Sequence, residues 1–326
     1  MSPFRYHRPE SMDEALALLQ EPGARALGGG TDLLPLVREA LAEPDMLVDL
    51  RRLPSSTAVT WRDDGGVRIG ASARIAHLAR NPELLAAFPL LARSCAAVGS
   101  AALRTMGTLG GNLCQRPRCW YFRGGFACLR SGGDSCSARA GEHQYHAILL
   151  DRGSETAGCV AVHPSDPAVA LTALDAIVHV AGSAGARDIP IADFFSGSAG
   201  RHDAETNLAP GEIVVAVSLP GSARGGVQHY EKAMQRGAFD FALVSLAATR
   251  REDGEVRLVL GGVALRPWRV TDSIEEDVAS GGLSDDDIET LAARALYDAV
   301  PLPKNGFKVD MAGALLRRGI ATIVAR

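Results

Sequence analysis

The chain has 326 residues, of which 47% are hydrophobic and 22% are charged, and its formal net charge is -4. This length predicts a globular protein of two or three domains with substantial cores. The charge balance argues against a nucleic-acid partner, since the sequence has no basic stripe and no block of like charge. No apolar run approaches the ~18 residues of a membrane span, and charges interrupt the N-terminal stretch where a signal peptide needs its apolar core.

The first 56 residues predict a small α/β unit. Apolar spacing and turn residues indicate, in chain order, a helix over 12–20, a strand over 24–27, a glycine turn, a helix over 33–41 and a strand over 45–50. Thr31 or Asp32 is the expected cap of the second helix.

Residues 57–222 predict a larger α+β unit, which a cysteine-rich insertion interrupts at about 113–160. We expect strands over 59–61, 67–71, 177–182 and 213–220, and helices over 90–103 and 166–176. The Pro/Gly/Ser-rich stretch 220–227 is typical of a linker. Residues 223–326 then predict a third α+β unit, with three strands, a helix capped by Ser284 and a C-terminal helix. The predicted fold class is therefore α+β.

Two glycine-rich turns fall between predicted strands and helices. The first lies in "ALGGGTDLLPL", residues 26–36, and the second is "GTLGGN", residues 107–112. Glycine lets the backbone approach a ligand closely, and free amides at a helix N-terminus attract an anion, so the pair suits the pyrophosphate of a dinucleotide. Neither turn has the spacing of a Rossmann or Walker motif, and the alternative interpretation is two unrelated tight turns.

The cysteines form the second conspicuous pattern, because four of the six lie between positions 114 and 136. Such clustering indicates metal or redox chemistry rather than a disulfide framework. Cys119, Cys128, Cys136 and Cys159 lack the short Cys-x2-4-Cys pairs of zinc fingers, which disfavours zinc without excluding it. A four-thiolate iron–sulfur cluster tolerates such wide spacing.

Two further cysteines and four arginines need separate interpretations. We expect Cys95 in an apolar core and Cys114 packed beside a bound cofactor. The arginines of this segment either offset the charge of the thiolates or form an ordinary solvated surface; they are Arg116, Arg118, Arg123 and Arg130.

The order "LGGGTDL", "TLGGN", "PSD" and "YEKAMQRGAFDFALVS" resembles the FAD-binding subunit of the molybdenum hydroxylases, the xanthine dehydrogenase family, over nearly the whole chain. Ordinary members pass quickly from the GGN turn to the PSD element, whereas this chain inserts the cysteine segment between Asn112 and Asp166. The insertion is similar to one that holds a [4Fe-4S] cluster in two subgroups, the FAD subunit of periplasmic aldehyde oxidoreductases and the β subunit of 4-hydroxybenzoyl-CoA reductase. "QRPRCWYFR" and "PLPKNGFKVDMA" are closer to the first subgroup.

This resemblance implies a two-part FAD-binding domain of the PCMH, or vanillyl-alcohol-oxidase-like, type. Its subdomains would span 1–56 and 57–222, and an α+β domain with a small antiparallel sheet and helices would follow over 223–326. The implied FAD-binding residues are Leu27, Gly28, Gly29, Gly30, Thr31, Asp32, Leu33, Thr108, Gly110, Gly111, Asn112, Asp166, Val214 and Lys232. The implied cluster ligands are Cys119, Cys128, Cys136 and Cys159.

Within this set, the resemblance assigns different roles to different groups. Backbone amides of 27–33 and 108–112 are expected to hold the FAD pyrophosphate. Asp166 is expected to bind the cofactor through its carboxylate, and Val214 and Lys232 are expected to lie beside the isoalloxazine ring.

The function implied by the resemblance is that of an electron-transfer subunit. Electrons would pass from the molybdenum cofactor of a large subunit, through the [2Fe-2S] clusters of a small subunit, to this FAD and then to ferredoxin or another external acceptor, in aldehyde oxidation. Substrate chemistry belongs to the partner, so we expect no catalytic residue in this chain. The alternatives are a 4-hydroxybenzoyl-CoA reductase-type β subunit and a zinc-stabilised structural subunit without flavin. We expect a cytoplasmic location, or a periplasmic one through co-export with a signal-bearing partner.

Overall fold

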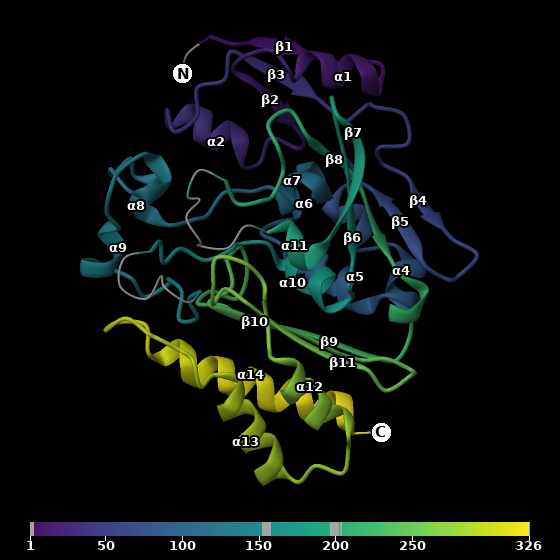
Figure 1. Cartoon of the computed structure of the whole chain (residues 1–326), viewed down its shortest axis with the longest axis vertical. Helices are drawn as coiled ribbons and strands as arrows, with labels where there is room; N and C mark the ends of the chain where they lie inside the picture. The colour runs from purple at the N-terminus through teal and green to yellow at the C-terminus, as the bar shows by residue number, and fades with distance from the viewer. Residues whose placement is uncertain (1–2, 152–157, 196–201, 203, 326) are drawn as a thin grey trace.

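The computed structural model describes residues 3–151, 158–195, 202 and 204–325. Its three β-sheets follow one another along the chain and through the molecule, from the N-terminal unit at the top of Figure 1 to the C-terminal helices at the bottom. In this part of the chain, no helix is both long enough and apolar enough to cross a membrane.

The first sheet is small and parallel, and its strand order is β1-β3-β2. Its elements are β1 (Arg5–His7), α1 (Met12–Leu18), β2 (Ala24–Leu27), α2 (Leu33–Arg38) and β3 (Met46–Asp49). Met46 and Val48 of the central strand share a core with Ala15 of α1. The edge strand β1 was not predicted, since its sequence "RYH" has no apolar alternation and all three of its residues are exposed.

The second sheet is antiparallel and has the order β4-β5-β8-β6-β7. Its strands are β4 (Val59–Trp61), β5 (Val67–Gly70), β6 (Ile177–Gly182), β7 (Gly185–Pro190) and β8 (Ile213–Leu219). β8 lies at the centre because its "IVVAVSL" run is rich in β-branched residues and pairs on both sides. Residues 59–70 therefore join a sheet with strands more than a hundred positions further along the chain.

Helices pack against this sheet and carry the second glycine turn. They are α3 (Ile75–Leu78), α4 (Pro82–Ala87), α5 (Pro89–Ala96), α6 (Ala101–Met106), α7 (Leu109–Leu113), α10 (Asp166–Ala173) and α11 (Ile191–Phe194). The helix expected over 90–103 is broken in two, since Gly99 adopts a φ of 43° and Ser100 caps a new helix by accepting a hydrogen bond from the Leu103 amide. α10 is buried along its whole length and forms the centre of the molecule.

The cysteine segment forms a lobe at the side of the molecule, beside α2 (Figure 1). It contains only short elements: α8 (Trp120–Arg123), the 3-10 turn η1 (Leu129–Ser131) and α9 (Ser137–Ala140). Phe122 and Cys128 pack with Leu36 of α2, so the lobe is anchored on the first subdomain.

The third sheet is antiparallel, in the order β12-β11-β10-β9, and three helices cover one of its faces (Figure 1). Its elements are η2 (Gly221–Ala223), β9 (Val227–Ala233), β10 (Val244–Arg250), β11 (Val256–Gly261), β12 (Trp268–Arg269), α12 (Asp272–Ala279), α13 (Asp285–Ala295) and α14 (Phe307–Val324). Ser284 caps α13 in a capping box with Asp287, as the sequence predicts. The mixture of sheets and helices confirms the α+β class, and each sheet lies within one of the three predicted units.

Candidate functional site

The two glycine turns lie in direct contact. A Cβ at Gly29 would stand 2.0 Å from the carbonyl oxygen of Met106, and a Cβ at Gly28 would stand 2.6 Å from Thr108 Oγ1. Both separations are far below van der Waals contact, so only glycine permits this approach of the first subdomain to the second. The structure thus brings together two turns that lie about eighty positions apart in the sequence.

The first turn offers backbone donors. The amides of Gly29, Gly30 and Thr31 meet no hydrogen-bond acceptor among the described residues, although all three residues are half-buried. Gly30 has a φ of 73°, which fixes the bend of the chain before α2. Successive free amides in such a turn form a concave site for an anion. α2 has only six residues, so these amides rather than a helix macrodipole supply the attraction.

The second turn uses most of its amides internally, which corrects the expectation for residues 108–112. The Leu109 and Gly110 amides donate to the carbonyls of Ala73 and Ala71, at 2.9 and 2.8 Å. Those of Gly111 and Asn112 donate to the Thr108 hydroxyl and carbonyl. This turn therefore contributes shape and side chains to the site rather than a row of free amides.

Asp166 and Lys232 form a buried ion pair instead of facing open solvent. Lys232 Nζ lies 2.8 Å from Asp166 Oδ2, the Tyr230 hydroxyl donates to Asp166 Oδ1 at 2.8 Å, and Lys232 also donates to the Ala97 carbonyl. Burial raises the pKa of Asp166, although Lys232 and Tyr230 oppose the shift. Both carboxylate oxygens are thus already engaged. Asn112 joins the same region, since its side-chain oxygen accepts a hydrogen bond from Ser165, the cap of α10.

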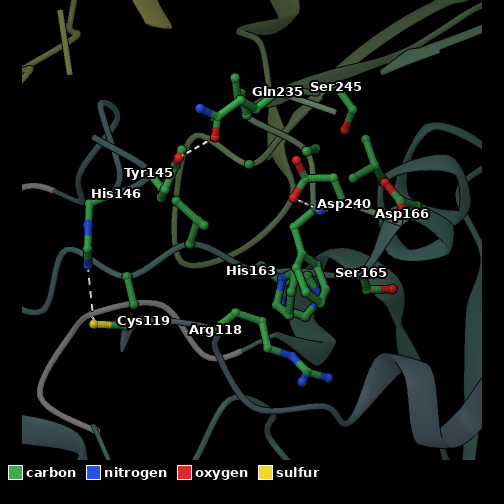
Figure 2. Close-up of a pocket in the computed structure, with 18 of the residues that line it drawn as sticks. Arg118, Cys119, Tyr145, His146, His163, Ser165, Asp166, Gln235, Asp240 and Ser245 are labelled. Carbon is green, nitrogen blue, oxygen red and sulfur yellow. Dashed lines mark hydrogen bonds between the residues drawn. The ribbon is translucent and has the colours of Figure 1, made fainter. Parts of the chain in front are cut away.

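Two adjoining cavities lie beside the glycine turns. The first is lined by Thr31, Asp32, Thr108, Gly111 and Asn112, together with Arg118, Arg236, Phe239, Asp240 and Phe241 from two loops. The second shares Arg118, Arg236, Asp240 and Phe241 with the first and extends to Cys119, His163 and Asp166. Figure 2 shows the second cavity, with His163 and Arg118 projecting into it and Asp166 and Ser245 at its far side.

His163 is the least satisfied polar residue of this cavity wall. It is 5% exposed, and neither ring nitrogen has a hydrogen-bond partner among the described residues. Burial lowers its pKa to about 3, so the ring is neutral. No sequence pattern around His163 predicts that its two unpartnered ring nitrogens lie in a cavity wall.

Val214 lies elsewhere. It lines a separate cavity between the first subdomain and the second sheet, together with Leu53, Ser55, Ser56 and Ser72. No other predicted cofactor-binding residue lines that cavity. The structure therefore does not bring Val214 and Lys232 to a common wall, and their joint contact with one ring stays a prediction.

The four candidate ligands line one narrow pocket. Cys119, Cys128, Cys136 and Cys159 come from separate loops and meet around it, with Tyr121, Phe122 and Arg130 completing the wall. All six cysteines of the chain are free thiols. In the described residues, no three His, Cys, Asp or Glu side chains gather tightly enough to hold one metal ion.

The thiols have distinct surroundings. Arg130 Nε donates to Cys159 Sγ at 3.3 Å, and His146 Nε2 lies 3.2 Å from Cys119 Sγ. Burial raises the pKa of Cys119 to about 11 and also raises that of Cys159, which Arg130 partly counters. Cys114 lies outside the pocket and packs against the main core, and burial raises its pKa to about 12. Cys95 is completely buried in that core, as expected.

The arginines of the segment are internal rather than a solvated surface. Arg118 and Arg123 both bind Asp32 Oδ1, at 2.9 and 2.7 Å, and the Arg116 amide donates to Asp32 Oδ2 at 2.8 Å. Arg116 and Arg130 both bind Glu205 Oε1, at 3.1 and 2.5 Å. Asp32, predicted as a cofactor contact, thus links the first glycine turn to the cysteine lobe.

The chain matches the family model described as the FAD binding domain in molybdopterin dehydrogenase over residues 2–222. It is 36% identical to the aldehyde oxidoreductase FAD-binding subunit PaoB of Escherichia coli K12, with 100% of this chain and 98% of that protein covered. It is 26% identical to the carbon monoxide dehydrogenase medium chain of Hydrogenophaga pseudoflava, with 99% and 98% covered.

Solved structures agree in fold. Carbon monoxide dehydrogenase from Hydrogenophaga pseudoflava superposes with a TM-score of 0.76 at 24% identity, covering 100% of this chain and 99% of that chain. Quinoline 2-oxidoreductase from Pseudomonas putida 86 gives a TM-score of 0.75 at 23% identity, covering 99% and 98%. The chain belongs to the family of FAD-binding subunits of the molybdenum hydroxylases, the xanthine dehydrogenase family, and is therefore an oxidoreductase subunit.

Proposed function

We propose that this chain is the FAD and [4Fe-4S] electron-transfer subunit of a molybdenum-containing hydroxylase complex that oxidises aldehydes. The observation that carries the proposal is the convergence of four cysteine thiols on one pocket, in a chain whose paired glycine turns belong to a FAD-binding domain. The two places are linked by adjoining cavities, because Cys119 and Arg118 line one cavity and Arg118 also lines the cavity at the glycine turns. Two redox groups held this close together suit a subunit that passes electrons rather than one that acts on the organic substrate.

The residues present fit FAD. The free amides of Gly29, Gly30 and Thr31 suit the negatively charged pyrophosphate, and the adjoining cavity offers the aromatic wall of Phe239 and Phe241 to a flat ring. When bound there, FAD would supply one- and two-electron transfer. Asp166, Lys232 and Tyr230 would hold the far wall in place through their buried contacts.

The residues of the cysteine pocket fit a [4Fe-4S] cluster. Two buried and two half-buried thiols beside an arginine have no obvious structural reason to converge, since an ordinary core would fill this space with aliphatic side chains. Metal binding would remove the protons of the four thiols. The burial that raises the pKa of Cys119 and of Cys159 would be offset by the iron and, at Cys159, by Arg130. Tyr121 and Phe122 would shield the pocket from water.

The partners and the substrate follow from the relatives. A molybdenum-cofactor-binding large subunit and a [2Fe-2S] small subunit would deliver electrons to this FAD, and ferredoxin or another external acceptor would receive them. Aldehyde oxidation is favoured because the relative at 36% identity is named as an aldehyde oxidoreductase subunit and matches over the whole chain. Assays of the assembled complex with aldehydes and with an aromatic thioester would separate this role from that of a 4-hydroxybenzoyl-CoA reductase-type subunit.

The first experiment measures iron, zinc, acid-labile sulfide and flavin on the anaerobically purified protein, together with an absorbance spectrum. We expect about four irons, four sulfides and one FAD per chain. Flavin with zinc and no sulfide would reassign the cysteines to a structural metal site. Folded protein with neither flavin nor iron would overturn the electron-transfer role.

A further inference from the structure

Arg130 occupies an unusual position in the wall of the thiol pocket. It belongs to η1, directly after Cys128 and Leu129, and its side chain is only 3% exposed. Its Nε donates to the sulfur of Cys159 at 3.3 Å. A buried guanidinium that contacts a sulfur carries its positive charge into a low-dielectric region, where it acts more strongly than at the surface.

Glu205 holds Arg130 in this position from another part of the chain. Its Oε1 atom lies 2.5 Å from Arg130 Nη1 and 3.1 Å from Arg116 Nε. One buried carboxylate therefore neutralises two guanidinium groups only in part, and the site keeps an excess of positive charge beside Cys159. Arg116 also donates its backbone amide to Asp32, so the same network continues to the first glycine turn.

This arrangement of charges would affect the reduction potential of a cluster bound at the four cysteines. Reduction adds one negative charge to a cluster that already carries four thiolates. Hydrogen bonds to the ligand sulfurs and nearby charges are known controls of the reduction potential of such a group. A donor on Cys159 and a net positive charge both stabilise the reduced state more than the oxidised state, so both raise the potential.

We propose that Arg130 sets the reduction potential of the cluster through its hydrogen bond to Cys159, and that Glu205 moderates this effect while fixing the arginine in place. Arg130 and Glu205 are positioning residues, because they act on the cluster through one of its ligands. The inference rests on the proposed function, since it requires a cluster at the four cysteines. It adds that two residues of opposite charge act on one cluster in opposite directions.

The experiment is an anaerobic potentiometric titration of the complete complex, with the reduced cluster followed by electron paramagnetic resonance. The variants are Arg130→Gln, Arg130→Lys and Glu205→Gln. Arg139→Gln is the matched control, because Arg139 lies in the same lobe and donates to the Gly158 carbonyl at 2.8 Å. Iron and sulfide are counted for every preparation, so that loss of the cluster is distinguished from a change in its potential.

Arg130→Gln should lower the ratio of reduced to oxidised cluster at a fixed potential by about tenfold, which corresponds to about 59 mV for one electron. Glu205→Gln keeps the shape and the acceptor oxygen but removes the negative charge, so it should shift the potential in the opposite direction. Arg130→Lys should lie between wild type and Arg130→Gln. Arg139→Gln removes a charge from the same lobe and should change the potential less than Arg130→Gln does. The potential of the flavin should change less than that of the cluster in each variant.

Two results would overturn the inference. One is an unchanged potential in Arg130→Gln with its full iron content. Another is a shift of Arg130→Gln and Glu205→Gln in the same direction, which a general loosening of the lobe would produce. If Arg130→Gln does not retain iron, Arg130→Lys takes its place in the comparison. Shifts of the potential in the same direction in Arg130→Lys and Glu205→Gln would then overturn the inference. Wild-type protein without iron and sulfide would instead defeat the proposed function itself.

Discussion

The flavin side and the thiol side of the candidate site are built by different means. At the glycine turns, the backbone forms the site, and the turns pack closely because Gly28 and Gly29 lack side chains. In the thiol pocket, side chains from four separate loops form the wall, and buried charges from distant residues hold those loops. Packing alone is enough to form a binding site made of backbone. Burying thiols away from water is unfavourable, and a bound metal would offset that cost. The two sides should therefore fail independently.

The largest expected effect is the loss of the cluster from Cys128→Ser, because a four-thiolate site lacks one ligand in this variant. Iron and sulfide should fall to near background while the FAD content stays near one per chain. Metal analysis and flavin absorbance measure both quantities in one preparation. Cys114→Ser is the control, since Cys114 lies outside the pocket and its loss should leave the iron content unchanged. Loss of FAD together with iron in a folded Cys128→Ser protein would contradict the independence of the two sides.

The next largest effect is a loss of stability when the buried ion pair of Asp166 and Lys232 is broken. Asp166→Asn leaves the Lys232 ammonium without its counter-charge and should lower the free energy of unfolding by about 3–5 kcal/mol. The double variant Asp166→Asn/Lys232→Met removes both charges and should recover part of this loss. Urea unfolding of four proteins measures the cycle: wild type, Asp166→Asn, Lys232→Met and the double variant. A double variant as unstable as the sum of the two single variants would show that the pair is not coupled.

A smaller effect is expected where the two glycine turns touch. Gly29→Ala would place a methyl group against the Met106 carbonyl, so the turns must separate, at a cost of about 1–3 kcal/mol in the free energy of unfolding. The FAD content should fall while iron is retained, which is the reverse of the cysteine variant. Gly306→Ala is the matched control, because a Cβ there meets nothing within 4 Å and its φ is -56°. Equal FAD content in both variants would mean that the contact between the turns does not shape the flavin site.

The smallest predicted effect is a pH dependence of the free energy of unfolding, caused by a buried lysine that contacts the thiol lobe. Lys308 is completely buried and donates to the carbonyls of His146 and Gly262, at 2.8 and 2.6 Å. Burial lowers its pKa from 10.5 to about 7. Between these two values the unfolded chain keeps the proton that the folded chain releases, so the free energy of unfolding rises with pH above 7 and is flat below it.

The rise from this group should be about 1 kcal/mol between pH 7 and pH 8. Unfolding of wild type and Lys308→Met across this range measures it as a difference in slope. The exposed Lys304, replaced by Met, is the control and should leave the slope unchanged. An equal slope in wild type and Lys308→Met would contradict the prediction.

The sequence predicts features that depend on neighbouring residues better than it predicts contacts between residues that are far apart in the chain. Strands such as 59–61 and 177–182 and the helix cap at Ser284 were predicted because they depend on residues adjacent in the sequence. The order of the glycine turns and the "PSD" element identified the family, which the comparisons confirm. The break in the helix at Gly99 was missed, since the apolar pattern continues through it.

Charge partners could not be predicted, and they changed the interpretation of the arginines. Exposed arginines had been one interpretation of the loop, yet Arg118 and Arg123 bind Asp32 from more than eighty positions away. Glu205 comes from a stretch with no recognisable motif, and its two arginine partners belong to the cysteine lobe. Such pairs depend on the tertiary fold, because nothing in the spacing of the residues encodes them. Of the predicted site residues, those in the two turns come together, while Val214 lies in a separate cavity.

The shared use of Asp32 and Glu205 has a consequence for anyone who wishes to remove the lobe. Excision of the cysteine segment, intended to yield a flavin subunit without the lobe, would delete the four arginines that bind Asp32 and Glu205. These two largely buried carboxylates would then have lost their arginine partners. The shortened protein would then carry uncompensated negative charge next to the free amides at the flavin turn. Trimming the lobe therefore requires neutral replacements at Asp32 and Glu205 in the same step. The inserted segment and the rest of the chain thus depend on each other for the neutralisation of their buried charges.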